Sequence, residues 1–218
     1  MKRVFIMGGE GVGMVAASIV DQLPDMEMVG FINDVEEKGT HIGKYKAFPV
    51  VGPTEDIPDI LEAEDAYIFN GFLGLTREKL VYEKIARIGV PKERLISVIH
   101  PTAVIPEDFC RVGSGVLFAP YSQLSPDVTV GDNCFLLGNS FVGHDTVLEE
   151  HVSLATNAVV GAYVRIGRGA HIGINASVKE KITIGEFSVI GMGAVVVKDV
   201  PDNSIVVGNP ARLLRHKQ

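Results

Sequence analysis

The sequence is poor in cysteine and carries no excess of positive charge, and both shortages narrow the possible functions. The two cysteines among 218 residues, Cys110 and Cys134, form no CxxC or other metal-ligand pattern. Free thiols that act as small buried hydrophobes are typical of a reducing compartment, so we expect a cytoplasmic protein. The formal net charge of −7 argues against nucleic acid as a partner, because binding phosphates requires a basic face.

Long hydrophobic runs are also missing. No apolar run approaches the roughly 20 residues that span a bilayer, so no membrane contact is expected. The N-terminal stretch MKRVFIMGGEGVG has no apolar core of signal-peptide length and instead indicates a strand followed by a glycine turn. With 46% hydrophobic and 22% charged residues, the chain is expected to form one large or two small globular domains.

Residues 1–95 alternate between strand and helix patterns. Short apolar runs predict strands within residues 2–9, 27–34 and 65–74. Helical spacing of apolar residues predicts helices within 13–23 and 75–90. Strands that alternate with helices predict a parallel sheet with helices packed on it.

From residue 99 onward the chain follows a six-residue period instead. Every sixth residue from Val112 to Val196 is apolar, at fifteen positions out of fifteen. The residue four places after each is small or β-branched, and glycine is frequent directly after the apolar position. A six-residue period fits neither an α-helix nor the alternation of an ordinary strand.

This period fits a triangular parallel β-helix, in which three hexads make one coil of about 18 residues. The every-sixth aliphatics are expected to point inward and stack from coil to coil, and glycine to permit the backbone of the corners. Between five and six such coils fit between Ile99 and Val196. We expect the flat outer faces to be covered by trimerisation, with active sites between neighbouring subunits.

With these hexads, the ending VVVKDVPDNSIVVGNPARLLR and the start IMGGEGVG, the chain resembles the bacterial sugar acyltransferases of the NeuD/PglD type. The resemblance covers essentially the whole chain. It implies a Rossmann-like α/β domain over residues 1–95, which binds a nucleotide sugar. It also implies a left-handed parallel β-helix over residues 96–218, which uses acetyl-CoA.

The glycine turn and the end of the second strand are the candidate nucleotide-sugar site. A strand–glycine–helix turn exposes backbone N–H groups, and an acidic residue about twenty positions later suits a ribose or a base. GGEGVG does not match the dinucleotide pattern GxGxxG, and a purely structural turn is the alternative interpretation. By resemblance, the substrate-binding residues are Gly8, Gly9, Gly11, Gly13, Asn33 and Asp34.

His144 followed by Asp145 is the candidate catalytic pair. A neutral imidazole suits the general base that acyl transfer needs near pH 7, and a neighbouring carboxylate fixes its tautomer. Without the resemblance, a solvated histidine at a coil corner is the alternative. His144, His151 and His171 occupy three different hexad positions, so they share no face and no metal site is expected. His151 is interpreted as a surface residue or, alternatively, as a peripheral contact of the site.

The resemblance also assigns acetyl-CoA contacts to Ser153, Ala162, Ile174 and Met192, with the Ala162 amide as the oxyanion donor. The chain departs from the family at two places. Ser153 stands where many members carry a second histidine, and Val12 stands where many carry a histidine in the glycine turn. The basic tail with Arg212, Arg215 and Lys217 is expected either to meet CoA phosphates or to be solvated.

The sequence therefore predicts a homotrimeric, acetyl-CoA-dependent acetyltransferase with no metal. The acceptor is expected to be the amine of a nucleotide-linked amino sugar, or a hydroxyl of a sugar such as a sialic acid. Transfer is expected to be direct, because no cysteine or serine has the context of a nucleophile. Two alternatives stay open, namely a non-catalytic nucleotide-sugar-binding scaffold and an acetyltransferase for a small non-sugar acceptor.

Overall fold

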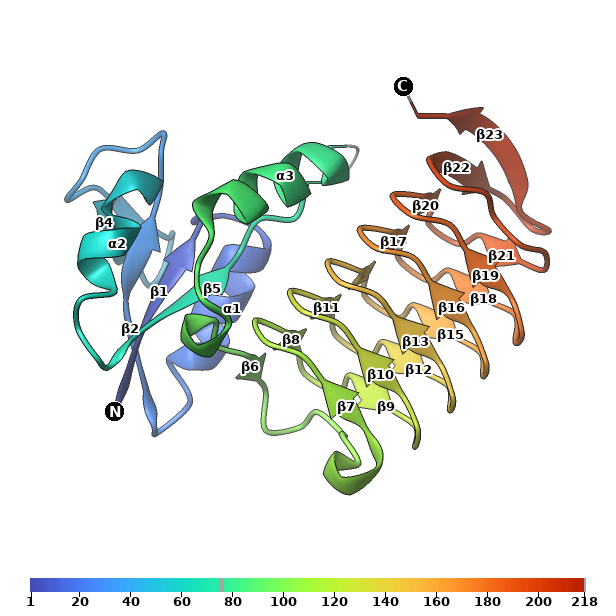
Figure 1. The fold of residues 1–218 in the computed structure, drawn as a ribbon, viewed down its shortest axis with the longest axis horizontal. Helices are drawn as coiled ribbons and strands as arrows, with labels where there is room; N and C mark the ends of the chain where they lie inside the picture. The colour runs from blue at the N-terminus through green and yellow to red at the C-terminus, as the bar shows by residue number, and fades with distance from the viewer. Residues whose placement is uncertain (75–76, 218) are drawn as a thin grey trace.

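The computed structural model describes residues 1–74 and 77–217, which form an α/β unit lying against a stack of short-stranded coils (Figure 1). The sheet of the α/β unit has the strand order β3-β4-β2-β1-β5, and only β3 runs antiparallel to its neighbour. Its elements are β1 (Lys2–Met7), α1 (Val12–Val20), β2 (Met26–Ile32), β3 (His41–Ile42), β4 (Phe48–Gly52), α2 (Ile57–Ile60), β5 (Ala66–Asn70) and α3 (Glu78–Ile88).

The predicted strands and helices of this unit are confirmed. β1 and β5 lie inside their predicted ranges, β2 begins one residue before its range, and α1 and α3 begin and end within one or a few residues of theirs. Leu75 and Thr76, at the start of the predicted second helix, lie outside the described residues. Between residues 35 and 64 the sequence predicted no element, and the structure has β3, β4 and α2 there.

From residue 98 the chain winds into a parallel β-helix, as predicted. From β7 on, strands of two residues follow one another at six-residue spacing, and each pairs with the strand 18 residues away, as Val142 does with Val160; β6 pairs with β8 at a separation of 19 residues. They are β6 (Val98–Ile99), β7 (Arg111–Val112), β8 (Leu117–Phe118), β9 (Gln123–Leu124), β10 (Thr129–Val130), β11 (Phe135–Leu136), β12 (Phe141–Val142), β13 (Val147–Leu148), β14 (Ser153–Leu154), β15 (Val159–Val160), β16 (Arg165–Ile166), β17 (His171–Ile172), β18 (Ser177–Val178), β19 (Thr183–Ile184), β20 (Val189–Ile190) and β21 (Val195–Val196).

Three sheets form the sides of the β-helix. One side, the domain-facing sheet, runs β22-β20-β17-β14-β11-β8-β6, and the antiparallel strand β23 (Arg212–His216) extends it beyond β22 (Ser204–Val207). A second side, the outer sheet, runs β21-β18-β15-β12-β9, and the third runs β19-β16-β13-β10-β7. Figure 1 shows the coils stacked as successive triangular turns.

The every-sixth aliphatics build the core of the β-helix, as predicted. Those from Phe118 to Val196 are at most 4% exposed, and the small residues four places later are buried beside them. Val112 is 37% exposed, because its strand pairs with a neighbour on one side only. The aliphatic position of each hexad in the sequence is therefore the position whose side chain faces the inside of the β-helix.

The prediction that glycine serves the corners through its backbone freedom is wrong for the glycines that follow the inner aliphatics. A Cβ on Gly143 would lie 2.6 Å from the carbonyl carbon of Gly161 in the next coil, so the close stacking of coils requires glycine there. The left-handed backbone lies two residues later, in every hexad from that of Val112 to that of Ile190. The residues with this positive φ are Gly115, Tyr121, Asp127, Asn133, Asn139, Asp145, His151, Asn157, Tyr163, Gly169, Asn175, Lys181, Phe187 and Gly193.

The two units share one apolar core. Phe69 of β5 contacts Phe135 of β11 with ring centroids 6.1 Å apart, and Leu117 belongs to the same cluster. Helix α3 lies over the domain-facing sheet, where Tyr82 packs edge-on against His151 and Phe187 at 5.0 and 5.8 Å. These contacts fix α3 relative to the coils.

Candidate active site and nucleotide-sugar pocket

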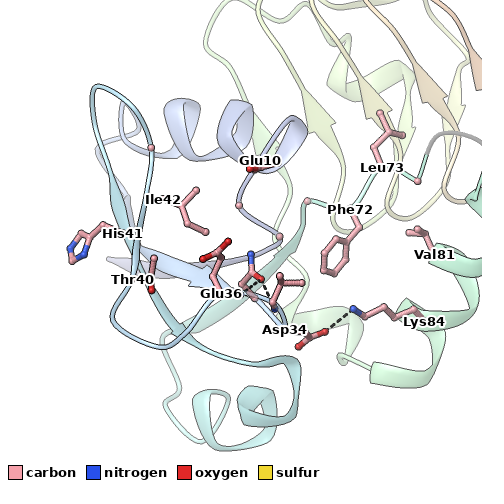
Figure 2. A pocket seen from close by; sticks show the side chains of 17 residues that line it. Glu10, Asp34, Glu36, Thr40, His41, Ile42, Phe72, Leu73, Val81 and Lys84 are labelled. Carbon is pink, nitrogen blue, oxygen red and sulfur yellow. Dashed lines mark hydrogen bonds and ion pairs between the residues drawn. The ribbon is translucent and has the colours of Figure 1, made fainter.

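A pocket of about 700 Å³ lies at the carboxyl ends of the parallel strands β1, β2 and β5 (Figure 2). Its walls come from residues 8–10, 33–36 and 71–74, which follow these strands, and from residues 40–43 and two residues of α3, Val81 and Lys84. Ligands of open α/β sheets bind at this edge, because loops from several strands converge there. The size is that of a small-molecule site.

The glycine turn supplies one wall of this pocket. Gly8 has a φ of +99° and donates its N–H to the carbonyl of Ile32 at 2.9 Å, which holds the turn against β2. Gly9 faces the Ile42 side chain, which a Cβ at this position would meet. Gly11 and Gly13 do not line the pocket. Gly13 lies in α1, and its Cα lies so close to Gly71 that a Cβ on Gly71 would be 2.8 Å from it.

Asn33 and Asp34 follow β2 and lie in the same pocket. The Asn33 carboxamide oxygen accepts hydrogen bonds from the backbone N–H groups of Val35 and Glu36, at 2.8 and 3.1 Å, which orders this turn. Asp34 accepts hydrogen bonds from the Thr54 N–H and from the Lys84 ammonium, both at 2.7 Å. The structure therefore brings together the predicted residues Gly8, Gly9, Asn33 and Asp34.

Lys84 is a pocket residue that the sequence did not reveal. It belongs to α3, yet its ammonium pairs with Asp34 and lies 4.7 Å from the centre of the Phe72 ring. Partial burial alone would raise the pKa of Asp34, but the hydrogen bonds from Lys84 and Thr54 outweigh it, so this pKa lies below its usual range. The carboxylate is charged at neutral pH and can accept hydrogen bonds from a ligand.

His144 and Asp145 form the predicted pair at a corner of the β-helix. The imidazole Nδ1 lies 2.7 Å from the Asp145 carboxylate, and Tyr163 packs edge-on against the ring at 5.1 Å. Asp145 has a φ of +56°, and this corner backbone turns its side chain toward the preceding histidine. With Nδ1 donating to the carboxylate, Nε2 is left as a proton acceptor on an open surface.

The residues assigned to acetyl-CoA fall on two faces. Ala162 lies one coil beyond His144 at the same corner, while Ile174 and Met192 lie in adjacent coils at the opposite edge of the outer sheet. Ile174 and Met192 are exposed. Ser153 lies on β14 of the domain-facing sheet and is buried, so within one chain it belongs to a different face.

Two histidines have partners that the sequence did not predict. The interpretation of His151 as a surface residue is wrong, because it packs under Tyr82 and burial lowers its pKa. His171 is buried and stacks on Ser153, with Nδ1 2.7 Å from the serine hydroxyl. The signal was present in the register, since residues 18 apart stack and 153 and 171 differ by 18.

The expectation for Lys217 is also corrected. Its ammonium forms an ion pair with Glu78 of α3 and donates to the carbonyl of Phe187 at 2.9 Å, so it is neither solvated nor free for phosphates. Both cysteines are free; Cys134 is buried, which raises its pKa to about 12, and Cys110 is partly buried. Within residues 1–74 and 77–217, no group of three or more metal-ligating side chains could hold an ion. No helix in the same described ranges is long and apolar enough to cross a membrane.

Neither a family model nor a curated protein matches the sequence, but solved structures match almost all of the chain. A histidine variant of perosamine N-acetyltransferase from Caulobacter crescentus, solved with CoA and GDP-perosamine, is 24% identical over 99% of this chain and 98% of its own, with a TM-score of 0.81. The acetyltransferase domain of PglB from Neisseria gonorrhoeae, solved with acetyl coenzyme A, is 26% identical over 98% and 99%, with a TM-score of 0.82. WeeI from Acinetobacter baumannii is 25% identical over 98% and 100%, with a TM-score of 0.77.

Hexads wound into a parallel β-helix, with a His–Asp pair on one corner, are the arrangement expected of hexapeptide-repeat acyltransferases. More particularly, the α/β unit in front of the coils and the full-length matches confirm the resemblance to the sugar acetyltransferases of the NeuD/PglD type. The chain is thus similar over almost its whole length to an acetyltransferase domain that was solved with acetyl coenzyme A.

Proposed function

We propose that the protein transfers the acetyl group of acetyl-CoA to the amine of a nucleotide-linked amino sugar, or to a hydroxyl of a sugar. The observation that carries this proposal is the hydrogen-bonded His144–Asp145 pair on a β-helix whose chain also carries a nucleotide-sized pocket. The perosamine enzyme of Caulobacter crescentus, solved with both CoA and GDP-perosamine, has the same two-part architecture. In the proposal, residues 1–95 are a Rossmann-like nucleotide-sugar domain and 96–218 a left-handed β-helical acyltransferase domain.

His144 is the general base in this proposal. Its Nε2 accepts a proton from the acceptor amine or hydroxyl as the new C–N or C–O bond forms at the thioester carbonyl. Asp145 holds the tautomer and stabilises the imidazolium, which then returns the proton to the departing CoA sulfur as the C–S bond breaks. The backbone N–H of Ala162, one coil from His144, is the proposed donor to the oxyanion.

The exposed apolar edges of the outer sheet support a homotrimer. Val159 on β15, Tyr163 beside His144 and the pair Ile174 and Met192 are exposed around this sheet. We propose that a neighbouring subunit covers this face and that the active site lies between subunits, with CoA along Ile174 and Met192. A protein of this kind would work in the cytoplasm, where acetyl-CoA is supplied.

A scaffold that binds a nucleotide sugar without catalysis is the second candidate. The replacement of two family histidines by Val12 and Ser153 favours it, since Val12 is a buried apolar residue of α1. The intact His144–Asp145 pair favours the enzyme.

The test is to incubate the protein with acetyl-CoA and a panel of nucleotide amino sugars, and to follow free CoA with a thiol reagent. Release of CoA that depends on one acceptor, and acetylated product by mass spectrometry, are expected. Absence of acceptor-dependent CoA release, together with stabilisation by a nucleotide sugar but not by acetyl-CoA in thermal unfolding, would establish the scaffold instead.

A further inference from the structure

A small cavity opens between α3 and the β-helix, next to the nucleotide pocket. We call it the junction cavity; its volume is about 20 Å³, which is room for one water-sized group. Phe72, Leu73, Gly74 and Val81 line both the junction cavity and the nucleotide pocket, so the two are neighbours along one wall.

The coil side of the junction cavity is polar although it is buried. Asn133, His151 and Ser153 line it, and Asn133 is only 5% exposed. Among the described residues, the Asn133 carboxamide oxygen has no hydrogen-bond partner, and its nitrogen lies 3.4 Å from His151 Nε2. Buried polar groups of this kind cost stability unless a partner satisfies them, so an unpaired one at a cavity indicates a ligand position.

The Ser153 hydroxyl is held in place by His171 in the next coil. The two side chains lie 2.7 Å apart and both are buried. Burial lowers the pKa of His171, and the positive charge of Lys217 lowers it further, whereas the negative charge of Glu78 raises it. The net effect is a lower pKa, so the ring is neutral at pH 7. When Nδ1 of the neutral ring donates to the serine oxygen, the serine O–H is free to donate into the junction cavity.

We propose that the junction cavity receives one hydroxyl or amino substituent of the sugar of the nucleotide-linked substrate, held against Asn133, His151 and Ser153. His171 is the positioning residue that orients the Ser153 hydroxyl. This inference rests on the nucleotide-sugar part of the proposed function. It adds the residues that distinguish a nucleotide sugar from the bare nucleotide.

Calorimetry tests the inference by comparing each nucleotide sugar with its own nucleotide. The probes are GDP-perosamine with GDP, and UDP-glucosamine with UDP, and the pair that the unaltered protein binds more tightly is used throughout. The sugar-bearing ligand is expected to bind more tightly than its nucleotide. Ser153→Ala and His171→Phe should each weaken the nucleotide sugar by about tenfold, the loss of one hydrogen bond, with nucleotide affinity unchanged.

Two further variants separate positioning from packing. His171→Asn offers a side-chain nitrogen near the place of Nδ1, so it should retain most of the affinity for the nucleotide sugar. His171→Phe keeps the volume of the ring but has no nitrogen that could donate to Ser153. The double variant Ser153→Ala/His171→Phe should bind no worse than either single variant, because one interaction is removed in all three. Ser122→Ala, a buried serine whose hydroxyl bonds within its own turn, is the matched control.

The calorimetric results tell a failure of this subsite apart from a failure of the proposed function. If the unaltered protein binds neither nucleotide, both the nucleotide pocket and the subsite are wrong. If it binds a nucleotide but the sugar adds nothing, or if Ser153→Ala and His171→Phe leave the sugar's contribution intact, the subsite alone is wrong. Equal weakening of nucleotide and nucleotide sugar would assign Ser153 and His171 a purely structural role.

Discussion

The Lys84 ammonium lies 2.7 Å from the Asp34 carboxylate, so a helix packed on the β-helix supplies a charge to the pocket of the α/β unit. Asp34 was found from its place after a strand, but its partner lies fifty residues further along the chain. The pocket therefore depends on how α3 is seated, which no local pattern encodes.

Removing this ammonium should raise the pKa of Asp34. Its pKa in the fold lies below the ordinary value of 3.8, so the pair stabilises the protein above that pH and the contribution is lost as pH falls through the folded pKa. In Lys84→Met the Asp34 titration, followed by carboxyl NMR, should move upward and the acid-unfolding curves of the two proteins should converge at low pH. Lys46→Met, which removes the partner of Asp21 outside the pocket, is the control. An unmoved Asp34 titration would mean that Thr54 alone holds the carboxylate.

His144→Ala should lower turnover by about 10²- to 10⁴-fold, the range that general-base catalysis supplies, while affinity for CoA stays the same. Asp145→Asn should also lower kcat, because the carboxylate no longer orients the imidazole. Asp127→Asn is a matched control, since Asp127 has the same left-handed corner backbone one coil earlier but follows a proline. Full activity in His144→Ala would exclude this residue as the base.

Gly143→Ala should destabilise the β-helix by about 1–3 kcal/mol, the usual cost of overpacking. The added Cβ would meet the backbone of Gly161 and Ala162, which cannot move without shifting a whole coil. Gly138→Ala, whose Cβ would approach a single carbonyl oxygen at 3.4 Å, should cost much less. Urea unfolding of the two variants measures the difference, and equal stability would refute the stacking explanation for glycine in this position.

Val159→Glu should convert the proposed trimer into a monomer, because it places a charge on the exposed outer sheet. Light scattering gives the mass of each species. Leu80→Glu, at an exposed position of α3 in the α/β unit, should leave the trimer intact. A monomeric mass for the unaltered protein would contradict the trimer itself.

The sequence predicted most of the β-helix because its packing contacts repeat at a fixed spacing along the chain. Each inner aliphatic meets the residue 18 positions away, so one-dimensional spacing determines three-dimensional contact, as with Val142 and Val160. The same reasoning failed for His151 and Lys217, whose partners Tyr82 and Glu78 lie on a helix from another part of the chain. The β4 strand was missed because FPVVG contains a proline and a glycine and has no clear alternation.

Helix α3 also connects distant parts of the chain. Glu78 is tied to Lys217, Tyr82 rests on the corner residues His151 and Phe187, and Lys84 reaches into the nucleotide pocket. Helix α3 is thus held by a middle coil through His151, by the last coil through Phe187 and by Lys217, which follows β23. The same helix that lines the nucleotide pocket with Val81 and Lys84 is therefore anchored by Lys217, near the end of the chain.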